Sequence, residues 1–116
     1  MKSIPVIDGH TDVLRRVRAG DVEFFQRNAA GHVDWPRLRE GGWAAALFAV
    51  WLDTEEVGDD ALRSALRLID VLWRLAGGSG GRLRVVQSAA DLDRALAGEF
   101  VGAILHLEGA EPIDPD

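Results

Sequence analysis

The sequence of 116 residues contains no cysteine. This absence excludes disulfide bridges, thiolate metal ligands and a cysteine nucleophile. A metal site in this chain must therefore use nitrogen and oxygen ligands. Long apolar runs are also absent. The longest, residues 43–52, has ten residues, against the ~20 residues that a helix needs to cross a bilayer.

Basic residues are in the minority, with 13 Lys and Arg against 19 Asp and Glu and a formal net charge of -6. They are scattered along the chain, which argues against a surface that follows nucleic-acid phosphates. We therefore expect small molecules or cations as partners, and no nucleic acid or membrane. The N-terminal residues lead directly into a polar segment, without the apolar stretch of a secretory signal, so a cytoplasmic location is expected.

Hydrophobic residues make up 47% and charged residues 28% of the chain, the balance of a folded domain. Three apolar segments, residues 4–7, 43–52 and 101–107, are typical of buried strands. Residues 60–76 and 89–97 have the spacing of amphipathic helices. This alternation predicts an α/β fold with parallel strands, and one partial domain over residues 1–116.

Local signals set the expected boundaries of these elements. Asp34 can cap a short helix that ends at Gly41 and Gly42. Asp59 and Asp60 suit the start of the first long helix, and Ser88 and Asp91 form a capping box for the second. Residues 83–87 are a brief strand candidate. The first long helix is expected to bury an apolar face made of Leu62, Ala65, Leu66, Ile69, Leu72, Trp73 and Ala76. Core or helix-packing positions are expected for Trp43, Trp51 and Trp73.

The segment Asp8-Gly9-His10-Thr11-Asp12 carries the most specific chemistry. Strand alternation is expected to place Asp8, His10 and Asp12 on one face. His10 and Asp12 would then form a nitrogen and oxygen pair for Zn²⁺ or a similar ion. Asp8 is a candidate for orienting His10 or a neighbouring ligand through a hydrogen bond. The alternative is a polar strand end without a metal.

The pair His32 and Asp34 has the same spacing, but Asp34 is needed as a helix cap, so His32 is expected to be a loop residue. Glu108 follows the strand at 101–107, where α/β enzymes place catalytic groups. It is a catalytic and metal-ligating candidate, or else a first-turn acid of a following helix. His106 shares its strand face, either as a further ligand or as an interior histidine below the site.

Three ordered segments of the chain resemble the membrane, or renal, dipeptidases, which are zinc peptidases related to the amidohydrolases. These segments are Ile7-Asp8-Gly9-His10-Thr11-Asp12, Asp34-Trp35-Pro36-Arg37-Leu38-Arg39-Glu40-Gly41-Gly42 with the strand that follows, and Leu105-His106-Leu107-Glu108-Gly109-Ala110-Glu111. The resemblance implies the N-terminal part of a TIM-type (β/α)₈ barrel with two zinc ions. It also implies that His10 and Asp12 bind one ion, that Glu108 bridges both, and that a hydroxide between the ions hydrolyses the peptide bond of a dipeptide.

A complete barrel of this type needs roughly 250 residues, so we expect this chain to carry only part of the site. The remaining ligands are then expected on the rest of the barrel, or the chain forms a homo-oligomer. The chain alone is expected to be inactive. The alternative is a non-catalytic fragment, or a metal-binding remnant of such a barrel.

Overall fold

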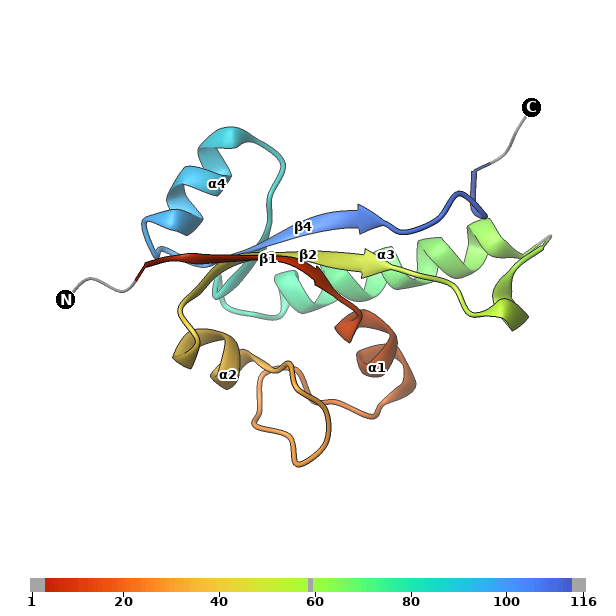
Figure 1. Ribbon diagram of the computed structural model, residues 1–116, viewed down its shortest axis with the longest axis horizontal. Coiled ribbons are helices and arrows are strands. Elements are labelled where there is room, and N and C mark those ends of the chain that lie inside the picture. Colours follow the sequence, from red (N-terminus) through yellow and green to blue (C-terminus); the bar gives the residue numbers. More distant parts are fainter. Residues whose placement is uncertain (1–3, 59, 114–116) are drawn as a thin grey trace.

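The computed structural model describes residues 4–58 and 60–113. These residues form four strands and four helices, which alternate along the chain except that α1 and α2 follow one another (Figure 1). The strands are β1 (Val6–Thr11), β2 (Trp43–Val50), β3 (Leu83–Val85) and β4 (Val101–Leu107), and the helices are α1 (Val13–Ala19), α2 (Trp35–Glu40), α3 (Ala61–Gly77) and α4 (Ala89–Leu96). A 3-10 turn, η1, spans Thr54–Glu56. No helix within the described ranges is long and apolar enough to span a membrane.

The four strands form one parallel sheet in the order β1-β2-β4-β3. The predicted α/β class with parallel strands is confirmed. β2 and β4 pair without interruption from Ala45 opposite Gly102 to Val50 opposite Leu107. The short β3 lies outside β4 and pairs only with its first three residues. Consecutive strands are neighbours in an ideal (β/α)₈ barrel, so β3 is an addition at the edge of the β1-β2-β4 series.

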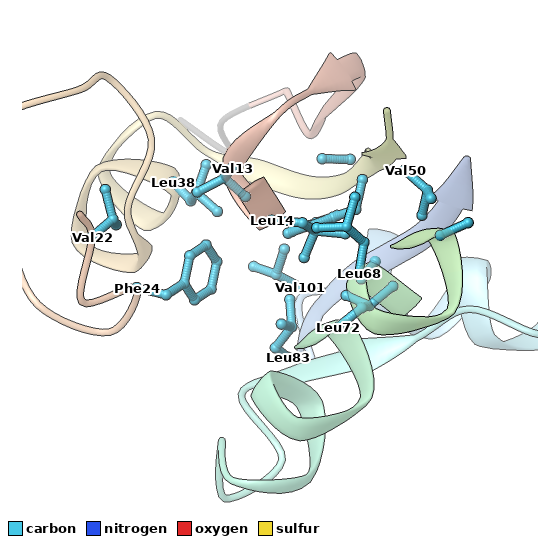
Figure 2. Close-up of a cluster of buried hydrophobic side chains, with 14 of the residues drawn as sticks. Val13, Leu14, Val22, Phe24, Leu38, Val50, Leu68, Leu72, Leu83 and Val101 are labelled. Atoms are coloured by element: carbon cyan, nitrogen blue, oxygen red, sulfur yellow. The ribbon is translucent and has the colours of Figure 1, made fainter. Parts of the chain in front are cut away.

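The two faces of the sheet are covered differently. Helices α1, α2 and α3 lie on one face and α4 on the other (Figure 1). The core forms on the first face, where side chains from α1, α3, β2 and β4 meet around Leu14, Val50 and Leu68 (Figure 2). On the second face, a Cβ at Gly102 would lie 3.2 Å from Ala95 of α4 and 3.3 Å from Ala45 of β2. These small residues let α4 sit closely on the amino-terminal half of the strands.

Helix α3 buries a different stripe from the one expected. Its buried residues are Ala61, Ser64, Ala65, Leu68 and Leu72. The predicted face was wrong at Leu62, Leu66 and Trp73, which are about half exposed. The helix has two adjacent apolar stripes, and the core takes the one centred on Leu68. Asp59, expected at the start of this helix, lies outside the described residues.

The loop between α1 and α2 is organised around one buried carboxylate. Asp34 is fully buried and caps α2, as predicted, by accepting from the backbone N–H of Arg37 at 3.0 Å. Its other oxygen accepts from the backbone N–H of Asn28 at 2.9 Å and from the Arg37 guanidinium at 2.6 and 2.8 Å. Arg37 in turn donates to the carbonyl of Gly31 at 2.8 Å. The guanidinium hydrogen bonds hold the pKa of Asp34 well below its usual value of 3.8.

We expect Asp34→Ala to lower the free energy of unfolding by roughly 3 kcal/mol, because it leaves Arg37 without its partner. This value is at the lower end of the range for breaking a buried ion pair, since the Arg37 side chain is still 27% exposed. The folded-state pKa of Asp34 lies below the unfolded value, so its contribution is complete above about pH 4 and declines as the pH falls further. Urea denaturation between pH 3 and pH 7 measures both effects.

Asp70→Ala is the matched control, because Asp70 pairs with Arg74 at 2.7 Å on the exposed side of α3. It should change the free energy of unfolding by no more than about 1 kcal/mol. Equal losses in the two variants would contradict the role given to Asp34.

Candidate metal centre

The end of β1 departs from regular strand geometry. Asp8 pairs with Ala46 and Thr11 with Phe48, so three steps along β1 match two along β2. This irregularity turns Thr11 into the buried core, and His10 projects to the opposite side. The Asp8 carboxylate accepts a hydrogen bond from the backbone N–H of His10 at 3.2 Å. Asp8 therefore holds the irregular backbone of His10 and makes no hydrogen bond to its ring.

Asp12 lies just beyond β1, at the position before α1. It makes no side-chain capping bond to the helix, which leaves its carboxylate available to other groups. That carboxylate lies 3.2 Å from Nε2 of His10. The expectation that Asp8, His10 and Asp12 share one strand face thus holds for His10 and Asp12, whose side chains contact each other. The Asp8 side chain instead binds the backbone N–H of His10.

Glu108 reaches the same place from β4. Its backbone N–H donates to the carbonyl of Val50 at 3.1 Å, which ties the end of β4 to the end of β2. Gly109 then turns the chain with a φ of 86°, a conformation that side-chain-bearing residues rarely adopt. A Cβ there would also collide with the Glu111 carboxylate, 2.1 Å away. Glu108 is therefore fixed at the strand end and does not begin a helix within the described residues.

Together, His10, Asp12 and Glu108 form a compact cluster. The Nε2 atom of His10 is 3.3 Å from a carboxylate oxygen of Glu108, and one ligand atom from each residue lies within 4.8 Å of the other two. The three side chains are 41–57% exposed. One imidazole nitrogen and two carboxylate oxygens suit Zn²⁺, with room for a further ligand. The donor set therefore fits a divalent ion, and the ligand assignment itself stays a prediction.

The other histidines differ in their relation to this cluster. The His106 ring lies edge-on to the His10 ring, with centroids 5.6 Å apart and planes at 78°. The His106 ring packs against the His10 ring, and His106 is not one of the three clustered residues. His32 is an exposed loop residue, as expected from the sequence, on a small pocket that also reaches Asp12 and Arg16.

A second group of side chains borders the cluster and was not found by the sequence reasoning. The Arg15 guanidinium lies 4.3 Å from the ring centre of Trp51 and donates to Asp53 at 2.9 Å. This hydrogen bond is the main reason that the pKa of Asp53 is lowered. One turn further along α1, Arg18 pairs with Glu56 and lowers the pKa of that carboxyl. These two ion pairs fix the segment after β2 to α1.

Comparisons with known proteins show the family to which the chain belongs. The family model for membrane dipeptidase, peptidase family M19, matches residues 1–116. The chain belongs to this family. Human dipeptidase 3 is 28% identical over 119 residues, covering 98% of this chain and 24% of that protein. An uncharacterised protein of Acinetobacter calcoaceticus is 26% identical over 140 residues, covering 99% of this chain and 44% of that protein.

Two solved structures share the fold. Dipeptidase AC, an M19 metallopeptidase, superposes with a TM-score of 0.85 at 32% identity, over 97% of this chain and 37% of that chain. A Rhodobacter sphaeroides metallopeptidase, solved with a phosphinate mimic of the dipeptide L-Ala-D-Ala, gives 0.85 at 28% identity over 97% and 40%. The chain spans less than half the length of these proteins. Their fold is a TIM barrel, and this chain covers part of it.

We expect His10→Ala to remove about one bound zinc ion per chain, because it deletes the only nitrogen donor of the cluster. Loss of a partner that merely orients a ligand weakens metal binding by about 10–100-fold, and loss of the ligand itself should cost more. Mass spectrometry of the metal content after dialysis against a weak chelator gives the number.

His32→Ala is the control, since it changes the other His-x-Asp sequence and should leave the metal content as it was. If His10→Ala kept its zinc, or if His32→Ala lost it, the cluster would not be the metal site.

Proposed function

We propose that this chain supplies the first metal ligands of a zinc-dependent dipeptidase, which hydrolyses the peptide bond of dipeptides. The observation that carries the proposal is the cluster of His10, Asp12 and Glu108 at the carboxyl ends of parallel strands, in a chain of the membrane dipeptidase family. The phosphinate dipeptide mimic bound by the Rhodobacter sphaeroides relative supports a dipeptide as the substrate class.

In this proposal His10 and Asp12 would hold one zinc ion, and Glu108 would hold that ion together with a second. Bound zinc supplies positive charge for the developing oxyanion and lowers the pKa of water. Within the cluster of the three described side chains, Glu108 is the ligand proposed for a second ion. The further ligands of that ion are proposed to lie on the rest of a complete barrel. The two carboxylates offset the charge of the cations they hold.

The neighbours of these ligands keep them in place. Asp8 holds the backbone of His10, and His106 limits the rotation of its ring. Gly109 turns the chain immediately after Glu108, just beyond the end of β4. Among the described elements, α4 covers the amino-terminal half of this sheet face, so the carboxyl strand ends that carry the three ligands lie away from it (Figure 1).

We expect Glu108→Gln to lower kcat for a dipeptide by at least 100-fold in the complete protein that carries this chain. The amide keeps the shape of the side chain, but it removes the negative charge and one of the oxygen ligands needed for metal-assisted catalysis, whose electrostatic contributions are of about this size. Steady-state hydrolysis of Ala-Ala and Leu-Ala with added zinc gives the rates.

Glu111→Gln is the matched control, because Glu111 is an exposed acid three residues further along. It should keep kcat within about threefold of the unchanged protein. Similar rates in the two variants would mean that Glu108 has no special role. If the protein without substitutions bound zinc but hydrolysed no dipeptide, this result would favour the non-catalytic alternative.

The 116-residue chain on its own is expected to hydrolyse no dipeptide, because a second ion would have one protein ligand. It is also expected to self-associate, since Leu62, Leu66, Leu105 and Leu107 leave apolar surface exposed on α3 and β4. Light scattering gives the mass, and a dipeptide assay with added zinc gives the rate. A monomer that turned over at ~1 s⁻¹ or faster would contradict both expectations.

A further inference from the structure

Trp51 lies at the edge of the sheet beside the metal-ligand cluster. Val50 pairs with Leu107 in the parallel ladder, so the next residues, Trp51 and Glu108, leave the sheet side by side. The Glu108 N–H bond to the Val50 carbonyl holds these two strand ends together. The position of Trp51 is therefore fixed relative to a candidate ligand.

The side of the sheet that Trp51 faces follows from its neighbours. Phe48, Val50 and Leu52 are all buried in the core under α1 and α3. Alternation along the strand and just beyond it places Ala49 and Trp51 on the opposite side. Ala49 pairs with His106, which contacts His10. Trp51 thus belongs to the face that carries the cluster, where it is 36% exposed, contrary to the expectation of burial.

The ring of Trp51 is held in place. Arg15 stacks on it at 4.3 Å and is anchored to Asp53 at 2.9 Å. The backbone N–H of Arg15 also donates to the carbonyl of Asp12 at 3.3 Å. The same residue therefore connects the indole to a candidate metal ligand. A rigid aromatic ring that stays partly exposed loses little conformational entropy when an apolar group covers it.

We propose that Trp51 forms a wall of the substrate site and selects dipeptides with a large apolar side chain over those with a methyl group. This inference rests on the proposed dipeptidase function and adds a specificity-determining residue to it. Arg15 covers one part of the indole, so the remaining exposed surface is available to an aliphatic or aromatic side chain of the dipeptide.

The test compares Trp51→Ala with Trp73→Ala in the complete, zinc-loaded protein. Trp73 is also exposed, at 48%, but lies on α3, which covers the other face of the sheet. We expect Trp51→Ala to lower the ratio of kcat/KM for Leu-Leu to that for Ala-Ala about tenfold, the size of effect that a lost apolar contact has on selectivity. Trp51→Phe should keep most of the ratio, and Trp73→Ala all of it.

A binding measurement gives a second readout that does not depend on turnover. Calorimetry with phosphinate mimics of Leu-Leu and Ala-Ala should show about tenfold weaker binding of the leucine mimic to Trp51→Ala and little change for the alanine mimic. Trp51→Phe provides the same comparison, with a smaller shift, if the alanine variant is unstable. An unchanged preference in a folded Trp51 variant, by rate and by binding, would overturn the role of Trp51 alone. Unchanged protein that neither hydrolysed a dipeptide nor bound either mimic would overturn the dipeptidase proposal and this inference together.

Discussion

The parallel pairing of β1, β2 and β4 is the constraint on which the rest of the structure depends. It brings the carboxyl ends of three strands to one edge of the sheet. His10 and Glu108, about 100 positions apart in the sequence, therefore lie within hydrogen-bond distance of each other. The irregular step at the end of β1 and the turn at Gly109 then end the two strands just before Asp12 and Glu108. Packing of the buried core around Leu14 and Leu68 keeps this edge in place (Figure 2).

The local elements could be predicted from the sequence because their signals are short-range. Asp34 and Ser88 cap α2 and α4 as expected, and the apolar runs became β2 and β4. The buried stripe of α3 could not be predicted, because Leu62 and Leu66 are as apolar as Leu68 and only the tertiary packing distinguishes them. The place of β3 outside β4 is likewise decided by pairing that has no local signal.

The candidate site shows the same division. His10, Asp12 and Glu108 could be predicted because each follows a short apolar segment of the sequence, and parallel strands bring the residues at their carboxyl ends together. The contact of Arg15 with Trp51 and Asp53 was missed, because it joins residues about 38 positions apart and charged residues are common on surfaces. The expectation that Trp51 is buried failed for a related reason, since strand alternation puts it on the side opposite to the core.

The most direct test of this account is anomalous diffraction at the zinc absorption edge, from crystals of the protein grown with zinc. The account predicts an anomalous peak at about 2.0–2.2 Å from Nε2 of His10 and from carboxylate oxygens of Asp12 and Glu108, the usual zinc distances for these donors. Zinc bound elsewhere, for example at His32, with none between these three side chains, would contradict it.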